Sequence, residues 1–130
     1  MRVAVPMTYV DGFLIPVPKA KLAAYRKMAR LGAKTWMKNG ALEYKECVLD
    51  DAKNVMPDGT AWPSLIPKMA GLKRGETLVF AFIVFKSKAH RDAVNKRVMA
   101  DPGMQGMDPK AMPFDMKRFG YAGFKTLVEA

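Results

Sequence analysis

Cysteine, histidine and long apolar runs are scarce in this sequence, and each scarcity excludes a class of protein. Cys47 is the only cysteine, so no internal disulfide can form, which is typical of a reducing compartment. The chain also has a single histidine, and one cysteine with one histidine offers no recognised spacing of metal ligands. The sequence shows no cofactor motif. The longest apolar run, residues 78–85, is far shorter than the ~20 residues of a membrane-spanning helix, and residues 1–8 lack the apolar stretch of a secretory signal. We therefore expect a cytoplasmic protein with no metal, no cofactor and no membrane partner.

The length and composition are those of one globular domain. The chain has 130 residues, half of them hydrophobic, and a mean hydropathy of -0.09. We expect residues 9–129 to form a single domain and residues 1–8 to be an N-terminal extension.

The first third of the chain predicts a strand followed by a helix. Residues 9–17 are rich in aromatic and β-branched residues and end in Pro-x-Pro, which favours a strand. Over residues 19–39, apolar residues recur at spacings of three and four, as on one face of a helix: Leu22, Tyr25, Ala29, Ala33 and Trp36. Gly32 lies beside this stripe and would let the helix approach a sheet closely, while Asn39 and Gly40 supply a stop signal.

Residues 41–49 predict a second strand at the edge of a sheet. Glu43, Lys45 and Glu46 place charges on both faces of this strand, which is typical of an edge. We expect Cys47, with no activating neighbour in the sequence, to be a small buried hydrophobic residue.

The segment from 50 to 75 is rich in proline and glycine and predicts a long irregular connection. Loops of this length are uncommon in a compact domain and are often functional. We expect four apolar residues to form a turn that pins the loop to the body, although Pro67 argues against a regular helix there. These residues are Trp62, Leu65, Ile66 and Met69.

The second half of the chain predicts a strand, a helix and a final strand. Residues 78–85 are all apolar, so the strand over residues 76–85 should be buried on both faces. Ser87 is a good N-cap for a helix over residues 88–100, which residues 101–103 terminate. A loop rich in methionine and proline precedes a strand near residues 118–128.

These elements predict an α+β fold of the ferredoxin-like βαββαβ type, with an antiparallel four-stranded sheet and two helices on one face. Val79 and Phe80 are neighbours with opposite orientation, and both are large and apolar. The face of the sheet that the helices leave bare therefore needs a cover. We expect a homodimer in which two copies pack sheet against sheet as a dimeric α/β barrel.

Four strings in the sequence resemble one protein family. They are YVDGF at 9–13, SKAHRD at 87–92, MADP at 99–102 and MPFDMKRFGYAGF at 112–124. Together they resemble the YbaA-like family of uncharacterised bacterial proteins over residues 7–129. The resemblance implies the dimeric α/β-barrel fold and brings no established activity. Ala122 stands where the resemblance leads us to expect a further glycine, which argues against a close backbone approach at that position. Met7 lines up with the usual start of such proteins, so the resemblance makes Met7 an alternative to Met1 as the first residue.

His90 is the first of three candidates for acid–base chemistry. The helix predicted over residues 88–100 places His90 on one face with Val94 and Val98. Its side chain has a pKa near neutrality and would suit a general acid or base. The alternative is a histidine packed at the margin of the core.

Asp11 and Asp115 are the other two candidates for catalysis. Asp11 interrupts an apolar strand, so its carboxylate is either a base with a raised pKa or the partner of Arg118 or Lys117 across the sheet. Asp115, in the MPFD string, either takes part in catalysis or fixes a turn through hydrogen bonds to the backbone.

Four further side chains could bind a substrate in a pocket between sheet and helices: Tyr9, Glu46, Arg118 and Tyr121. Tyr9, Glu46 and Tyr121 also fit cross-strand packing or solvation at an edge. The sequence holds 11 methionines, several of them in the loop before the last strand, which we expect to pack onto the mouth of the barrel.

The chain has 22 basic and 12 acidic residues, and the basic excess is concentrated in the first predicted helix. Arg30, Lys34 and Lys38 fall on one stripe of that helix and could follow the phosphates of an RNA. The stripe has no interleaved aromatic residues and matches no RNA-recognition signature, so a solvated helix face is the alternative.

The leading hypothesis is a homodimer that binds or transforms a compact organic molecule. Apolar walls with a few polar groups would suit a cofactor-independent oxygenase or isomerase, by analogy with the superfamily alone. The sequence leaves open whether the protein is an enzyme. The competing hypothesis is a basic module that binds RNA through the first helix.

Overall fold

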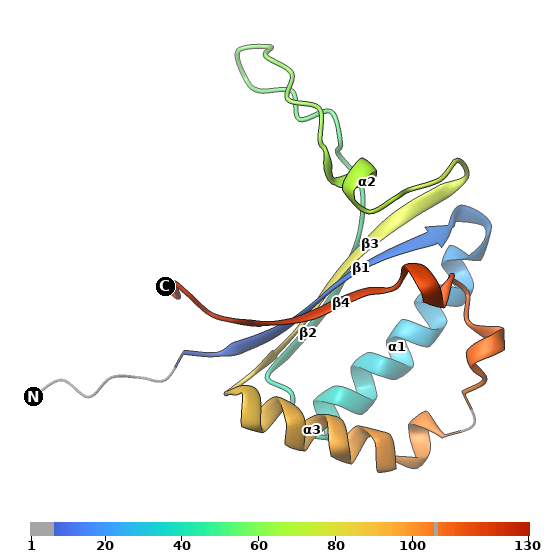
Figure 1. Cartoon of the computed structure of the whole chain (residues 1–130), viewed down its shortest axis with the longest axis vertical. Coiled ribbons are helices and arrows are strands. Elements are labelled where there is room, and N and C mark those ends of the chain that lie inside the picture. Colours follow the sequence, from blue (N-terminus) through green and yellow to red (C-terminus); the bar gives the residue numbers. More distant parts are fainter. Residues whose placement is uncertain (1–6, 106) are drawn as a thin grey trace, which may run out of the picture.

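The computed structural model describes residues 7–105 and 107–130, and it has the expected α+β architecture. Four antiparallel strands form one sheet in the order β2-β3-β1-β4, and two long helices cover one of its faces (Figure 1). The sheet of a single chain is open and is not closed into a barrel. Most of the extension predicted at residues 1–8 lies outside the described residues.

The two central strands have the same length and pair along all of it. β1 (Tyr9–Pro18) runs antiparallel to β3 (Glu76–Phe85), from the pair Tyr9 and Phe85 to the pair Pro18 and Glu76. β2 (Glu43–Val48) pairs only with β3, which confirms the prediction of an edge strand. β4 (Gly120–Lys125) pairs with β1 and is shorter than the strand predicted near residues 118–128.

The helices bury the apolar faces that their sequences predict. α1 (Leu22–Lys38) follows a short 3-10 turn, Lys19–Lys21. α3 (Lys88–Ala100) has Ser87 as its N-cap, whose side chain accepts a hydrogen bond from the backbone N–H of His90 at 3.0 Å. Two buried clusters form the core against them, one around Val17 and Tyr25 and one around Phe85 and Val94. No helix in the described ranges is long and apolar enough to cross a membrane.

Gly32 and Gly40 have the roles that the sequence predicts. A Cβ atom on Gly32 would lie 3.0 Å from the hydroxyl oxygen of Tyr44 on β2, so the missing side chain lets α1 lie close to the sheet. Gly40 has a φ of 113°, in the region that favours glycine, and it ends the helix.

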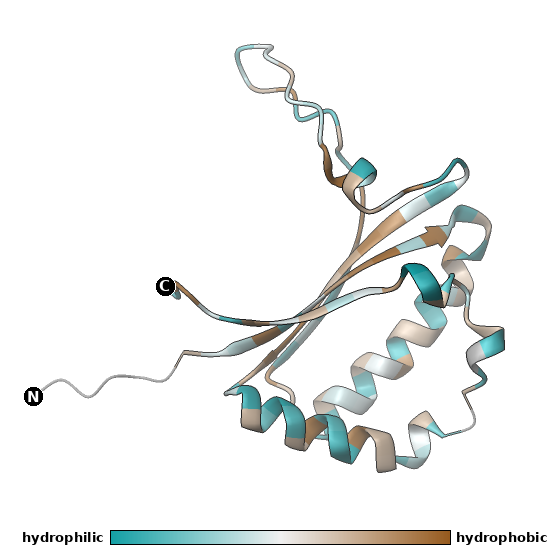
Figure 2. Ribbon diagram, in the orientation of Figure 1, coloured by the Kyte–Doolittle hydropathy of each residue, from teal (hydrophilic) through white to brown (hydrophobic). Residues whose placement is uncertain are grey.

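The face of the sheet away from the helices is open in the single chain and carries exposed apolar side chains. Figure 2 shows the hydrophobic stretches of the strands that form it. It carries Leu14 of β1, Phe80 of β3 and Phe124 of β4, all of them exposed. Cys47 also lies on this face, opposite Phe80, and is exposed. The expectation of a buried Cys47 is therefore wrong for the single chain, because β2 points this residue away from the helices.

Residues 50–65 form an arm that projects from the end of the sheet (Figure 1). The arm is a narrow hairpin in which Val55 and Ala61 form an isolated bridge, and it leads into the short helix α2 (Ile66–Met69). Trp62 is 64% exposed and Met69 is 79% exposed, so these apolar residues do not pin the loop to the body, and that expectation is wrong. Pro67 is accommodated because it lies in the first turn of α2, where no backbone N–H is needed.

Candidate functional site

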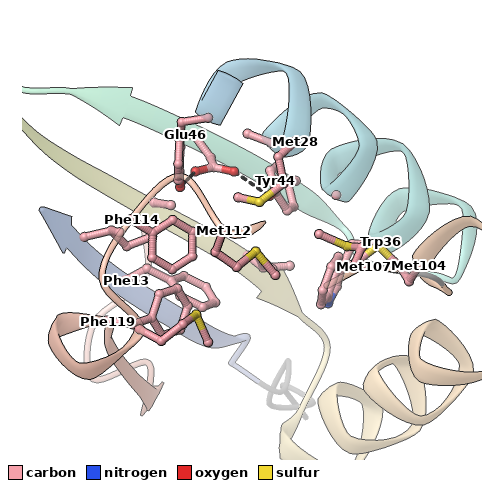
Figure 3. A pocket seen from close by; sticks show the side chains of 17 residues that line it. Phe13, Met28, Trp36, Tyr44, Glu46, Met104, Met107, Met112, Phe114 and Phe119 are labelled. Carbon is pink, nitrogen blue, oxygen red and sulfur yellow. Dashed lines mark hydrogen bonds between the residues drawn. The ribbon is translucent and has the colours of Figure 1, made fainter. Parts of the chain in front are cut away.

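A cavity of about 210 Å³ lies between the sheet, α1 and the loop that follows α3 (Figure 3). Its wall is almost entirely aromatic, aliphatic and thioether. The main contributors are Phe13, Met28, Trp36, Met104, Met112 and Phe119. The cavity therefore offers a largely apolar wall.

Strand alternation explains which residues reach this cavity. Phe13 and Ile15 of β1 and Ala81 and Ile83 of β3 are spaced by two and share the face that the helices cover. The small side chain of Ala81 leaves room above the centre of the sheet. The methionine-rich loop lines the opposite side of the cavity, whereas the expected barrel mouth is not formed by the open sheet of a single chain.

Glu46 is the only carboxylate among the described residues that line the cavity. The hydroxyl of Tyr25, on α1, donates a hydrogen bond to one of its oxygens, and the hydroxyl of Tyr44 donates to the other at 2.6 Å. Burial, reinforced by the negative charge of Glu46, raises the pKa of both tyrosines, so both remain protonated donors at neutral pH. The result is an ionisable group held in a fixed orientation on an apolar wall.

Of the predicted substrate-binding residues, only Glu46 lines this cavity. Tyr25 and Tyr44 were not predicted as site residues. Tyr25 lies on the apolar stripe of α1 and was read as core, and Tyr44 is two positions before Glu46 on the same face of β2. That spacing of two was the signal in the sequence that could have linked Tyr44 to Glu46.

A second polar group surrounds Asp11, which is 2% exposed. Arg91 Nη1 lies 2.9 Å from Asp11 Oδ1, and the hydroxyl of Tyr121 donates to Asp11 Oδ2 at 3.0 Å. The guanidinium of Arg91 also lies 5.1 Å from the centre of the Tyr9 ring. Three predicted residues, Tyr9, Asp11 and Tyr121, are thus brought together by Arg91, which was not predicted.

Asp11 is paired, but with a different partner from the one expected. The sequence suggested Arg118 or Lys117 across the sheet, and the structure has Arg91 of α3 instead. Burial raises the pKa of Asp11, and this effect exceeds the opposing effects of the Tyr121 hydrogen bond and the Arg91 charge. Asp11 is not among the described residues that line the cavity.

His90 also lies apart from the described lining of the cavity. Its Nδ1 accepts a hydrogen bond from the backbone N–H of Lys86 at 2.9 Å, and its ring packs edge-on against Phe85. Burial, together with the charges of Lys86 and Arg97, lowers the pKa of His90 and favours the neutral ring. This environment matches the alternative of a histidine at the margin of the core.

Asp115 and Arg118 both make local contacts. Asp115 Oδ1 accepts a hydrogen bond from the backbone N–H of Lys117 at 2.9 Å and caps a 3-10 turn, Met116–Arg118. Arg118 forms a two-pronged pair with Glu76, at 2.6 and 2.7 Å, and donates to the carbonyl of Gly71. The donors of Arg118 thus hold the start of β3 against the end of the long connection.

The predicted basic stripe is on the outer surface of α1. Arg30, Lys34 and Lys38 are all exposed. Lys38 Nζ also lies 3.4 Å from Asp101 Oδ2, so one member of the stripe has an acidic neighbour.

Comparison with known proteins places the chain in a family. The family model described as "Protein of unknown function (DUF1428)" matches residues 8–116. The chain belongs to the DUF1428 family. Its relatives include the uncharacterized protein YbaA of Escherichia coli K12 and that of Shigella flexneri, each 39% identical over 123 residues, which are 95% of this chain and 99% of the relative.

The DUF1428 match includes both polar groups described above, apart from Tyr121. Glu46, Tyr25 and Tyr44 lie within residues 8–116, as do Asp11 and Arg91. The expected resemblance to YbaA-like proteins is therefore confirmed. In β4 of this DUF1428 protein, a Cβ atom on Gly120 would lie 2.9 Å from the carbonyl oxygen of Leu14, and a Cβ atom on Gly123 would overlap the hydroxyl of Tyr9, so the close approaches in this strand are at these two glycines.

Proposed function

We propose that this protein binds a compact organic molecule in the cavity beside Glu46. The volume of about 210 Å³ is below the ~300–1,000 Å³ typical of sites for larger ligands, which favours a small one. The observation that carries the proposal is the Glu46 carboxylate, held by two tyrosine hydroxyls on an otherwise apolar wall.

The chemistry of Glu46 indicates the kind of ligand. An ionised carboxylate has about four acceptor positions, and the two tyrosines occupy two of them. A ligand that donates an O–H or N–H bond would satisfy a further position, whereas an anionic ligand would be repelled. We therefore propose a neutral or cationic molecule with an apolar body and one donor group, such as a small phenol or amine. The same carboxylate could accept a proton in an isomerase or oxygenase reaction.

We further propose that the protein is a homodimer joined through its sheets. Phe80, Phe124 and Leu14 leave the centre of the sheet apolar on the side without helices. Contiguous apolar surface of this kind is typical of an interface. A second copy offers the same surface, and a two-fold pairing of sheets would cover both.

The pocket proposal is tested by screening compact phenols, alcohols and amines for an increase in thermal stability, followed by titration calorimetry. Glu46→Gln keeps the shape and removes the charge, and we expect it to weaken a binding ligand about 10-fold or more. Glu43→Gln is the matched control, since Glu43 lies on the opposite face of the same strand. Ala81→Leu and Ala29→Leu fill the cavity from the sheet and from the helix, and both should abolish binding. Ligands that bind these filled variants as they bind the wild type would refute the proposal.

A second candidate function is RNA binding by α1, which the exposure of Arg30, Lys34 and Lys38 favours. If the stripe follows phosphates, log Kd for single-stranded RNA should depend steeply on log salt, and replacing all three residues by glutamine should reduce that slope by about 2. Negligible binding at low salt excludes this function.

A further inference from the structure

The wall of the cavity is negatively charged, although the chain as a whole is strongly basic. The sequence has 22 lysines and arginines against 12 acidic residues. None of the described residues that line the cavity is a lysine, an arginine or a histidine, and Glu46 is the one acidic residue among them. The described wall therefore has a formal charge of −1 in a protein whose total is +10. A site of this charge attracts a cation and repels an anion.

The Glu46 carboxylate has hydrogen-bond donors but no cationic partner in the part of the chain that the structure describes. Two tyrosine hydroxyls donate to it, and no lysine or arginine nitrogen lies within 4.0 Å of its oxygens. Arg26 lines a smaller adjoining cavity that shares Glu46, yet the two form no ion pair. Asp11 and Glu76, by contrast, each pair with an arginine. A carboxylate on an apolar wall gains much from a cation, because the local dielectric constant is low.

Two groups of aromatic rings flank this carboxylate, and each group donates one of its hydrogen bonds. In the first, Tyr25 packs edge-on against Phe114 at 5.9 Å between ring centres, and Phe114 stacks on Phe119 at 5.5 Å. In the second, the ring of Tyr44 lies 6.4 Å from that of Trp36. Figure 3 shows Phe114 and Phe119 on one side of the cavity and Trp36 on the other. The face of an aromatic ring attracts a cation, and tryptophan attracts it most strongly.

We propose that the ligand of this cavity is a compact ammonium ion, a protonated amine with apolar substituents. Its N–H group donates to Glu46, and its carbon groups contact the aromatic rings and the methionines. Apolar substituents are needed because such a wall cannot replace the water around a strongly hydrated cation. This inference rests on the pocket proposed above and narrows its ligand from a neutral or cationic molecule to a cation.

Three probes with the same phenyl body test the sign of the charge that the cavity selects. Benzylamine is protonated at neutral pH, benzyl alcohol is a neutral donor, and benzoate is an anion. Each is titrated into the wild type by calorimetry. We expect benzylamine to bind about 10-fold more tightly than benzyl alcohol, because a hydrogen bond from a charged donor contributes more than one from a neutral donor. Benzoate should show no measurable binding.

Variants assign this preference to the carboxylate and to the rings. Glu46→Gln should remove the preference for benzylamine, whereas Glu43→Gln, on the opposite face of the same strand, should keep it. Trp36→Phe and Trp36→Leu both lose the hydrogen bond from Trp36 to Asn95, so the difference between them isolates the aromatic ring. The preference should be smaller in Trp36→Leu than in Trp36→Phe. Trp62→Leu is the control, because Trp62 is 64% exposed on the arm.

The outcomes separate this inference from the pocket itself. Benzyl alcohol that binds the wild type as tightly as benzylamine, and loses binding in Ala81→Leu, would overturn the ammonium ligand and leave the pocket standing. A preference for benzylamine that survives in Glu46→Gln would overturn it as well. Should Glu46→Gln not fold, the comparison of probes in the wild type still decides. If no probe binds the wild type more tightly than it binds Ala81→Leu, both the pocket and its ammonium ligand are refuted.

Discussion

Removing the charge of Arg91 should destabilise the protein by leaving the Asp11 carboxylate buried without its counter-ion. In the variant Arg91→Met, the aliphatic stem is largely preserved, and Tyr121 remains as the hydrogen-bond donor to Asp11. Breaking a buried ion pair at one partner costs about 3–5 kcal/mol. The side chain of Arg91 is 14% exposed, so water can reach the edge of the pair, and we expect the lower end, about 3 kcal/mol.

The loss of unfolding free energy in Arg91→Met should become smaller as the pH falls. Burial raises the pKa of Asp11 in the folded protein, so the folded state binds this proton more readily than the unfolded chain. The stability linked to Asp11 is therefore greatest below its unfolded pKa of about 3.9 and falls as pH rises through the folded value. Without Arg91 the folded pKa rises further, and the deficit of Arg91→Met should shrink on acidification as the carboxyl becomes neutral.

Urea denaturation of four proteins measures this effect. They are the wild type, Arg91→Met, Asp11→Asn and the double variant, each near neutral pH and in mild acid. We expect the double variant to regain most of the stability that Arg91→Met loses, because no buried charge is left unpaired. A loss below ~1 kcal/mol for Arg91→Met, or a double variant no more stable than the single one, would refute the pairing as the reason for the buried Asp11.

Three further outcomes are expected. Pairing with Arg118 lowers the pKa of Glu76 to about 2. The stability that this ionised carboxylate adds to the folded protein is therefore present above the unfolded pKa of about 4.3 and is lost as pH falls toward 2. In urea unfolding at several pH values, Glu76→Gln should make the free energy of unfolding depend less on pH in this acid range. Gly123→Ala should lower the unfolding free energy by about 1–3 kcal/mol, and adding Tyr9→Phe should restore part of it by removing the overlapping hydroxyl. The thiol of Cys47 should react with a maleimide at low protein concentration and more slowly as a sheet-to-sheet dimer forms; a constant rate in a proven dimer would argue against that interface.

The segments with the strongest local signals were predicted to the residue. β3 and α3 have the predicted bounds because an uninterrupted apolar run and the cap at Ser87 mark them independently of the rest of the chain. Cys47 was wrongly expected to be buried because its burial depends on which face of β2 the helices cover. Since both faces of that strand carry charges, the sequence did not show which face is the covered one. The apolar residues of the arm were expected to pack on the body of the chain, because hydrophobicity alone does not show whether a side chain contacts its own chain or remains exposed.

The candidate site was likewise predicted only in part. Glu46 was predicted as a ligand-binding residue, since a charge on a strand is visible in the sequence. Arg91 was missed because 80 positions separate it from Asp11, and the packing of α3 on the sheet brings them together. Arg118 falls at the start of the last predicted strand and was therefore expected to pair with Asp11 across the sheet, yet it pairs with Glu76. Ion pairs between a helix and a strand depend on the crossing of the two elements, which residue spacing does not encode.

The two proposed surfaces lie on opposite faces of the same two strands, which leads to a last prediction. Glu46 and Cys47 are neighbours on β2, one facing the cavity and the other the open face, and Ala81 and Phe80 divide β3 in the same way. β2 is held by a single neighbouring strand, so a second copy packed on its open face would fix the backbone that carries Glu46. We therefore expect the dimer to bind a cavity ligand more tightly than the monomer.

Linkage then requires the ligand to tighten the dimer by the same factor. The measurement is the dissociation constant of the dimer with and without saturating ligand, in the wild type and in Ala81→Leu, which should bind no ligand and show no change. Phe80→Glu, which places a charge on the open face, should yield a monomer with weakened ligand binding although it alters no cavity residue. Equal dimer affinity with and without ligand would mean that the rest of the sheet already holds β2 rigid and that the two faces act independently.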